Sequence, residues 1–222
     1  MRYDLVIFDN DGVLVDSEPL ANTILAAYLT ELGHPTTYEE SVRDYMGAAI
    51  HRVHDTIRER TGRRLPATFD EDFHQRVFDA FARELQPVAG VEEVLRELGA
   101  AGVPYCVASS GSHEKIRVGH RTTGLDHYFL DARVFSAEDV GRGKPAPDLF
   151  LHAARSMGVA PERCAVVEDS VLGVEAAVSA GMDVYGYTAM TEAARLHQAT
   201  ALFSDMARLP GLLAATAAVR PD

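Results

Sequence analysis

A short apolar stretch near the start of the chain ends abruptly on two carboxylates, and this feature constrains the fold more than any other. Residues 5–8 (Leu-Val-Ile-Phe) form a continuous apolar run typical of the middle of a parallel sheet, and Asp9 and Asp11 follow at once. In open α/β sheets the ligand crevice lies beyond the carboxyl ends of the strands, so we expect these two acids at a site. Gly12 allows the backbone to turn sharply there.

Two carboxylates at this spacing are capable of two kinds of chemistry. Their oxygens can bind a hard cation, and one of them can attack an electrophile. An ordinary solvated Asp-Asn-Asp-Gly turn explains residues 9–12 about equally well, because acidic turns are common. The rest of the chain decides between these interpretations.

The composition limits the partners of the chain. Its 222 residues carry a formal net charge of −12, which argues against nucleic acid or an anionic membrane as the main partner. Acidic residues interrupt the apolar stretch near the N-terminus before a secretory signal could form, and no window approaches the ~18 uncharged apolar residues of a membrane span. Cys106 and Cys164 each lie in an apolar run, which predicts buried, reduced thiols and a cytoplasmic location. Lysine is nearly absent, with only Lys115 and Lys144.

Residues 17–86 differ in pattern from the sequence on either side. Apolar residues recur there at helical spacing, with no strand-like run between them. Examples are Leu20, Ile24, Ala27, Tyr28, Leu32, Val53, Ile57, Phe73, Val77, Phe78, Phe81 and Leu85. The segment ends near Pro87 and Gly90, which indicate a hinge or boundary. We therefore expect a helical cap domain over residues 17–86, inserted into a core domain made of residues 1–16 and 87–222.

After residue 90 helices and strands alternate. Helices are expected over residues 91–101, 112–122, 147–157 and 171–180, and strands over residues 103–108, 132–135, 164–167, 183–187 and 201–203, before a last helix. This alternation predicts βαβ units with right-handed crossovers. The predicted fold class is α/β, a doubly wound parallel sheet (a Rossmann-like core) with an inserted α-helical cap.

Two further loops carry groups that suit an anion. Residues 109–112 (Ser109, Ser110, Gly111 and Ser112) follow a strand and open a helix, so their backbone N–H groups could cradle a phosphate, although an ordinary serine N-cap explains them at least as well. Lys144 stands in the loop Gly-Arg-Gly-Lys-Pro-Ala-Pro-Asp, where it could meet an anion or simply be solvated. A Walker A loop is excluded, because Pro145 stands where that motif needs a serine or threonine.

Glu168 and Asp169 follow the expected strand over residues 164–167. Adjacent acids at the end of a central strand, covered on both faces, are hard to explain by solubility, so a metal ion or another cation should balance them. Helix capping by Asp169 or Ser170 could hold at the same time.

Together these segments resemble the four motifs of the haloacid dehalogenase-like hydrolase superfamily. The matching stretches are residues 8–18 (Phe-Asp-Asn-Asp-Gly-Val-Leu-Val-Asp-Ser-Glu), Ser109, residues 143–148 (Gly-Lys-Pro-Ala-Pro-Asp) and residues 167–170 (Val-Glu-Asp-Ser). They occur in the order of the family, with a helical segment between the first two, and the resemblance covers essentially the whole chain. Within the superfamily the chain is similar to the phosphoglycolate phosphatase and β-phosphoglucomutase-like branch, whose members mostly hydrolyse small phosphate monoesters.

The resemblance implies a role for each catalytic residue. Asp9 is implied as the nucleophile that forms an aspartyl-phosphate, and Asp11 as the general acid/base. Lys144 is implied as the cation that neutralises the transferring phosphoryl group and orients Asp9. The implied phosphate-binding residues are Ser109, Ser110, Gly111 and Lys144.

The implied cofactor is Mg²⁺, held by Glu168 and Asp169 alongside Asp9 and the main-chain carbonyl of Asp11. The physics supports this independently, because the side chains of Asp9, Asp11, Glu168 and Asp169 bring four negative charges toward an anionic substrate. The implied activity is magnesium-dependent hydrolysis of a small phosphate monoester: a sugar phosphate, a sugar-acid phosphate or a phosphoglycolate-like ester.

Rival activities differ at single residues. A dehalogenase needs no metal site, so the acids near the strand ends speak against it, and a phosphonate hydrolase needs a cap lysine, which residues 17–86 lack. A phosphosugar mutase is the main alternative, although Ala21 and Ile50 stand where its basic cap residues would be, with His51 one residue away. A non-catalytic phosphoester-binding module is the weaker alternative, because no key group is missing.

In the cap, His51 and His54 are expected on a solvated helix face, since no third ligand lies nearby in the sequence; whether they contact substrate is left open. Side chains around residues 46–51 are expected to recognise the leaving group. The expected partner is a small-molecule phosphate monoester, with no nucleic acid and no membrane, and the chain is expected to be a monomer or a weak homodimer.

Overall fold

The computed structural model describes residues 2–46 and 50–215. Contacts within the chain divide it into two compact units: Met1–Val15 with Pro87–Asp222, the core unit, and Asp16–Gln86, the cap unit. The assignment of these units as catalytic and cap domains stays a prediction. Within residues 2–46 and 50–215, no helix has both the length and the apolar character needed to cross a membrane.

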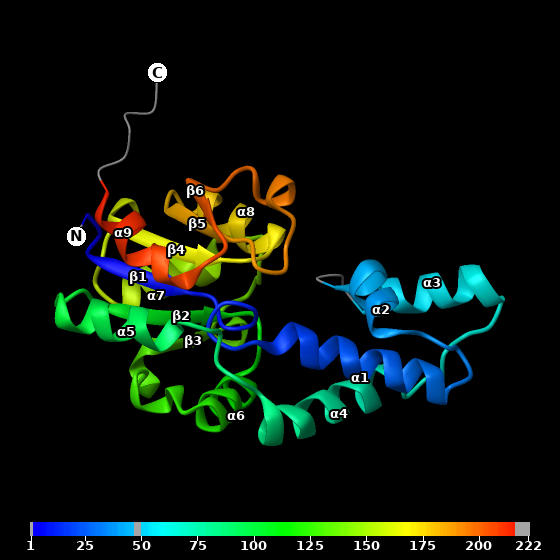
Figure 1. The fold of residues 1–222 in the computed structure, drawn as a ribbon. Helices are drawn as coiled ribbons and strands as arrows, with labels where there is room; N and C mark the ends of the chain where they lie inside the picture. Colours follow the sequence, from blue (N-terminus) through cyan, green and yellow to red (C-terminus); the bar gives the residue numbers. More distant parts are fainter. Residues whose placement is uncertain (1, 47–49, 216–222) are drawn as a thin grey trace. The chain divides into compact units, whose positions relative to one another are not determined.

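The core unit is built on a six-stranded parallel sheet (Figure 1). Its strands are β1 (Leu5–Phe8), β2 (Tyr105–Ser109), β3 (Val134–Ser136), β4 (Cys164–Glu168), β5 (Asp183–Tyr187) and β6 (Ala201–Phe203). The strand order is β3-β2-β1-β4-β5-β6, so β1 pairs with β2 on one side and β4 on the other. The chain changes direction across the sheet between β1 and β4, which is where doubly wound sheets bind ligands. The predicted fold class is confirmed.

Helices cover both faces of this sheet. They are α5 (Val91–Ala100), α6 (His113–Thr123), α7 (Asp148–Ser156), α8 (Val171–Ser179) and α9 (Leu209–Ala214). Short 3₁₀ turns join them: η1 (Leu125–His127), η2 (Asp131–Arg133), η3 (Ala137–Asp139), η4 (Pro161–Arg163), η5 (Ala193–Leu196) and η6 (Met206–Arg208). Apolar side chains of α7 and α8 pack with Leu5 and Ile7 in one cluster, while α5 and α9 contact each other in front of the sheet in Figure 1. Burial on both faces explains the continuous apolar strand sequences.

Three strands differ from the prediction, and β4 differs only in ending at Glu168 rather than at residue 167. β2 starts two residues later than expected, because Pro104 has no N–H to donate to the ladder, and it extends to Ser109, which lies opposite Ser136 of β3. β3 starts at Val134 rather than at residue 132, because the three preceding residues form η2. The ends of α5 to α8 lie within one residue of those predicted.

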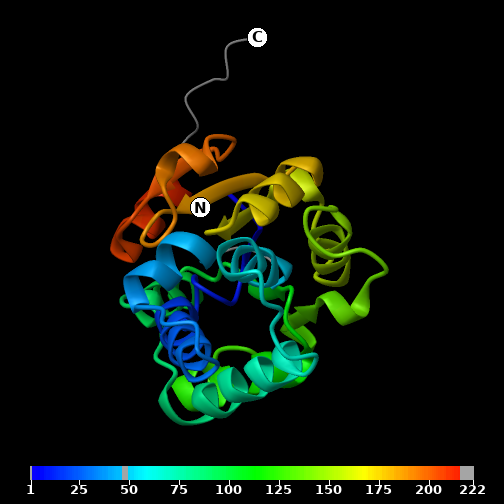
Figure 2. The same ribbon diagram turned by 90° about the vertical axis from the view of Figure 1, so that its right-hand side faces the viewer.

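The cap unit is helical, as predicted. Its helices are α1 (Ser17–Glu31), α2 (Tyr38–Tyr45), α3 (His51–Thr61) and α4 (Phe69–Glu84). α1 packs against α2 and α4 (Figure 2). Their apolar side chains cluster around Phe69, whose ring stacks on Tyr28 with centroids 5.2 Å apart. Residues 47–49, in the segment expected to recognise the leaving group, lie outside the described residues.

The two cap histidines have different surroundings. His51 is exposed, as expected. His54 is only partly exposed: its Nε2 lies 2.6 Å from Asp70 Oδ1, and its ring meets Phe69 edge-on at 5.3 Å. The prediction of a solvated position is therefore wrong for His54, because this side of α3 faces the start of α4.

Candidate active site

A lysine lies between two buried carboxylates at the carboxyl ends of β1 and β4. Lys144 Nζ donates to Asp9 Oδ1 at 2.5 Å and to Glu168 Oε1 at 2.6 Å. The side chains of Lys144 and Asp9 are 5% and 10% exposed, and that of Glu168 is fully buried. Burying an unpaired charge is very costly, so these three groups depend on one another. The alternative of a solvated loop lysine is wrong for Lys144.

Glu168 is held by protein donors at both of its oxygens. Oε2 accepts hydrogen bonds from the N–H and from the hydroxyl of Ser170, each at 2.9 Å. Ser170 is also the N-cap of α8, since its hydroxyl accepts from the N–H of Gly173, which confirms the expected cap. A Cβ at Gly173 would lie 1.7 Å from Glu168 Oε1, so only glycine lets α8 start this close to the carboxylate.

Three carboxylates form a group that could hold a metal ion. Oxygens of Asp9, Glu168 and Asp169 all lie within 4.8 Å of one another. The turn after β1 approaches this group closely: Gly12 has φ +78°, and a Cβ there would lie 2.1 Å from Asp169 Oδ2. Gly12 therefore provides both the left-handed turn and the space for Asp169.

Asp11 has a partner that the sequence analysis did not assign. Lys115 Nζ donates to Asp11 Oδ2 at 2.9 Å, and the two side chains are 34% and 25% exposed. The other oxygen, Oδ1, is buried and makes no hydrogen bond within the described residues. The scarcity of lysine was the available signal, because both lysines of the sequence contact carboxylates at this edge of the sheet.

The charges at this edge do not cancel completely. The carboxylates are those of Asp9, Asp11, Glu168 and Asp169, and the ammonium groups are those of Lys115 and Lys144. Four negative and two positive charges leave two negative charges, which one divalent cation would balance. The donor atoms are all oxygens, which suits a hard ion such as Mg²⁺.

Burial dominates the electrostatics of this cluster. Burial raises the pKa of the Asp9 carboxyl to about 7 against the opposing effect of the Lys144 ammonium, and the neighbouring Glu168 carboxylate raises it further. For Lys144, burial lowers the pKa, but Asp9 and Glu168 outweigh burial and keep the pKa above its ordinary value. Lys144 therefore stays an ammonium, and a further cation beside Asp9 would favour the ionised carboxylate that a nucleophile requires.

The loop after β2 is held in a fixed shape. Ser109 is 1% exposed, and its Oγ accepts from the N–H of Gly111 at 3.0 Å. The carbonyl of Gly111 accepts from Ser136 Oγ at 2.6 Å, which ties the loop to β3. Ser110 is exposed, and Ser112 caps α6. The ordinary N-cap interpretation therefore holds for Ser112 and not for Ser109.

A buried histidine anchors the residue between the two aspartates. His120 Nε2 lies 2.9 Å from Asn10 Oδ1, and the His120 ring packs 5.1 Å from that of Phe129. His120 is 3% exposed, and burial lowers its pKa to about 4. The imidazole is thus neutral at neutral pH and fixes the loop that carries Asp9 and Asp11.

His120 should make the stability of the fold depend on pH. Its pKa is lower in the folded chain than its ordinary value of 6.5, so the unfolded chain binds the proton first and stability is lost as the pH falls from 6.5 toward 4. Over this range we expect the wild-type free energy of unfolding to fall by about 3 kcal/mol more than that of His120→Asn. Urea titrations at several pH values measure this difference. The exposed-site control His127→Asn should follow the wild type, and equal pH slopes for wild type and His120→Asn would contradict the prediction.

These features define a class of enzyme. Lys144 holds the Asp9 carboxylate where the strand order of the parallel sheet reverses. Carboxylates that could bind a metal ion and a loop of small residues lie beside it. This arrangement provides the positioning and charge neutralisation that phosphoryl transfer requires. The chain belongs to the haloacid dehalogenase-like hydrolases, whose family model matches residues 3–181. The resemblance noted from the motifs is confirmed.

Relatives and solved structures cover nearly the whole chain. The 6-phosphogluconate phosphatase of Escherichia coli (strain K12) is 32% identical over 216 residues, which are 95% of each chain. Hexitol phosphatase A of the same organism is 32% identical over 201 residues, 89% of each chain. The crystal structure of a HAD family hydrolase from Deinococcus radiodurans R1, with bound phosphate and sodium, is 31% identical and superposes with a TM-score of 0.85 over 96% of each chain.

Proposed function

We propose that this chain is a magnesium-dependent phosphatase that hydrolyses a small phosphate monoester of a sugar or sugar acid through an aspartyl-phosphate intermediate. The observation that carries the proposal is the buried Lys144 ammonium, 2.5 Å from Asp9 Oδ1 at the carboxyl end of β1. This contact orients the Asp9 carboxylate and places a positive charge where a phosphoryl group would arrive. Positioning and charge stabilisation supply most of the catalysis in phosphoryl transfer.

The proposed chemistry has two displacements at phosphorus. In the first, an Asp9 oxygen attacks phosphorus, the bond to the ester oxygen breaks, and Asp11 gives its proton to that oxygen, which leaves as an alcohol. In the second, Asp11 takes a proton from water, the water oxygen attacks phosphorus, and the bond to Asp9 breaks to release phosphate. Asp11 is protonated again and Asp9 is a free carboxylate, so the cycle closes.

The remaining residues bind and neutralise the phosphoryl group. Lys144 and the loop of Ser109, Ser110 and Gly111 would contact its oxygens. Mg²⁺ would be held by Asp9, Glu168, Asp169 and the main-chain carbonyl of Asp11. When bound, it would neutralise further negative charge of the phosphoryl group. Because both oxygens of Glu168 already accept from protein donors, we expect Asp9 and Asp169 to be the main carboxylate ligands.

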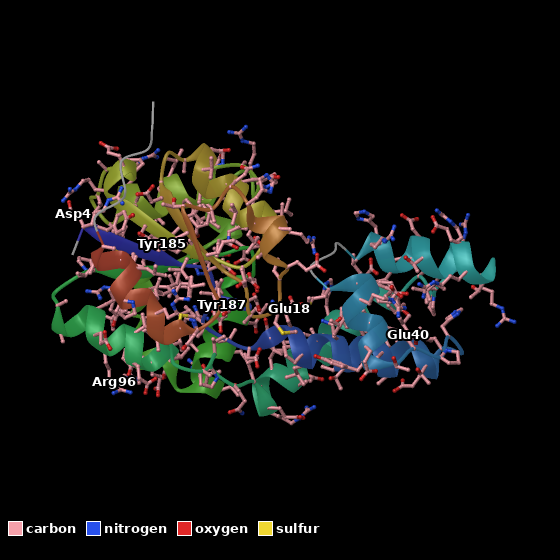
Figure 3. The ribbon with its side chains drawn as sticks, turned by 45° about the horizontal axis from the view of Figure 1, so that its top comes forward. Asp4, Glu18, Glu40, Arg96, Tyr185 and Tyr187 are labelled. Carbon is pink, nitrogen blue, oxygen red and sulfur yellow. The ribbon has the colours of Figure 1, made fainter. Side chains whose placement is uncertain are left out.

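The cap unit contains a cavity of about 220 Å³. Ala21 and Ile50 line it, and the described residues around it include no lysine or arginine. A mutase must hold a second phosphate, for which arginine and lysine are the usual partners. The cavity instead presents Glu18 on α1 (Figure 3) and Tyr45, whose buried hydroxyl makes no hydrogen bond within the described residues. Such groups can form hydrogen bonds with the hydroxyls of a ligand.

The names of two relatives support a phosphorylated sugar or sugar acid as the substrate, and two buried thiols support a cytoplasmic location. The names of the bacterial relatives state phosphorylated sugar acids and sugar alcohols as their substrates. Cys106 and Cys164 are buried free thiols, which fits a reducing compartment. The expected oligomeric state, a monomer or weak homodimer, stays a prediction.

A substrate screen tests the proposed function. Purified protein with Mg²⁺ is assayed for phosphate release from a panel of sugar, sugar-alcohol and sugar-acid phosphates, and the products are followed by phosphorus NMR. We expect free phosphate in proportion to substrate consumed, near-complete loss of activity in Lys144→Met, and wild-type activity in Arg142→Met, which removes an exposed cation from the same loop. Phosphate release from none of the esters, or an isomeric phosphate formed before free phosphate, would overturn the proposal.

A further inference from the structure

We propose that Lys115 selects phosphate esters whose leaving group carries a carboxylate. This inference rests on the proposed function and assigns to the core unit a residue that determines specificity. Lys115 Nζ lies 2.9 Å from Asp11 Oδ2. Because Asp11 hands its proton to the ester oxygen in the proposed reaction, a group in contact with Asp11 lies beside the leaving group.

The contact between Lys115 and Asp11 can exchange for a contact with substrate. The two side chains are 34% and 25% exposed, so solvent and ligands reach the pair. Ion pairs with this exposure contribute little to stability, so exchanging one carboxylate partner for another costs little. The flexible four-carbon stem of lysine lets the ammonium follow a ligand over several ångströms.

The Lys115 side chain passes next to the phosphate-binding loop. A Cβ at Gly111 would lie 3.3 Å from Lys115 Cδ, 3.4 Å from Ser109 Oγ and 3.9 Å from Asp11 Oδ2. The lysine stem, the serine hydroxyl and the carboxylate thus surround one glycine. A phosphate ester bound at Ser109 with its ester oxygen toward Asp11 would place its leaving group within reach of the ammonium.

The neighbouring cations of the core unit contact other carboxylates. Lys144 is buried between two carboxylates. Arg142 donates two hydrogen bonds to Asp148, and His113 lies 2.8 Å from an aspartate of η3. Among the described residues of the loops that follow β1 to β4 and of the first turn of α6, Lys115 is the cation that combines solvent access with contact to the Asp11 carboxylate.

Matched substrate pairs test this inference. The pairs are 2-phosphoglycolate with the monophosphate of ethylene glycol, 3-phosphoglycerate with glycerol 3-phosphate, and 6-phosphogluconate with glucitol 6-phosphate. In each pair the second ester has a neutral hydroxymethyl group in place of the carboxylate. We measure kcat and KM with saturating Mg²⁺ for the wild type, Lys115→Met, Lys115→Arg and Arg117→Met. Arg117 is an exposed cation on the same helix and serves as the matched control.

We expect the wild type to prefer the acid in at least one pair by about tenfold in kcat/KM, as one charge-assisted contact allows. Lys115→Met should lose most of that preference, mainly through a higher KM for the acid, while Lys115→Arg retains it and Arg117→Met matches the wild type. If the wild type has equal kcat/KM for both esters of every pair, the inference about Lys115 is overturned while the proposed function stands. An equal loss on acid and neutral esters in Lys115→Met would also overturn it, since Lys115 would then act only by positioning Asp11. A wild type that hydrolyses none of these esters, nor p-nitrophenyl phosphate, would overturn the proposed function as well.

Discussion

Replacing Asp9 by asparagine is expected to abolish phosphate release, by about four orders of magnitude or more, because an amide of nearly the same shape is a very poor nucleophile. The fold should survive. Burial raises the pKa of the Asp9 carboxyl to about 7, so the ionised group is less favourable in the folded chain than in the unfolded chain, and stability falls as the pH rises toward 7. In metal-free buffer at neutral pH, Asp9→Asn should therefore be at least as stable as the wild type. Steady-state kinetics and thermal unfolding measure the two effects.

The opposite end of the same strand supplies the control for this experiment. Asp4 lies just before β1 (Figure 3), is exposed, and pairs with Arg163 at 2.7 Å. Asp4→Asn removes the same charge and should keep wild-type kinetics. Substantial turnover in a well-folded Asp9→Asn protein would remove Asp9 from its proposed role.

Removing divalent metal should have an effect of similar size. We expect excess EDTA to reduce phosphate release to background and Mg²⁺ to restore it, because the carboxylates outnumber the two ammonium groups before an anionic substrate arrives. The uncompensated charge is −2 with Asp11 ionised and −1 with the proton that Asp11 donates in the proposed reaction. Phosphate-release assays across a Mg²⁺ titration measure the requirement. Full activity in EDTA would contradict the prediction and favour a metal-free mechanism.

Asp169→Asn sharpens the same prediction. Losing one charged ligand should raise the Mg²⁺ concentration needed for half-maximal activity by roughly ten- to a hundredfold, or abolish activity. Glu162→Gln is the matched control, because Glu162 is an exposed acid in η4, just before the first residue of β4 and away from the candidate site. An unchanged magnesium requirement in Asp169→Asn would exclude Asp169 as a ligand.

Much of this architecture could be predicted from local sequence. β1, β5 and β6 have the predicted bounds. For β1 the reason is that a fully buried apolar run lies between two aspartates, Asp4 and Asp9, as expected of a central parallel strand. The bounds of β3 could not be predicted in this way, because Ala132 is apolar but belongs to η2. Apolar character gives the position of a strand, whereas local backbone hydrogen bonds determine its first residue.

The candidate site was predictable as a set of residues but not as a set of contacts. Strand ends and motif order indicated Asp9, Lys144 and the two acids at the end of β4, since parallel strands bring their carboxyl ends to one edge. The contacts of Asp11 with Lys115 and of Asn10 with His120 span 104 and 110 residues. Both partners come from α6, and their orientation depends on how that helix packs, which no local pattern of the sequence encodes.

The position of the two lysines has a practical consequence for covalent labelling. Amine-reactive dyes, crosslinkers and resins attach to lysine side chains, and the sequence offers only Lys115, about one third exposed, and Lys144, which is buried. Both cysteines are buried as well, so thiol reagents do not offer an accessible alternative. Lysine-directed attachment would therefore modify this protein at the edge of the sheet that carries the candidate active site. A fluorophore or tether placed away from that edge needs a cysteine or lysine introduced on a distant exposed surface.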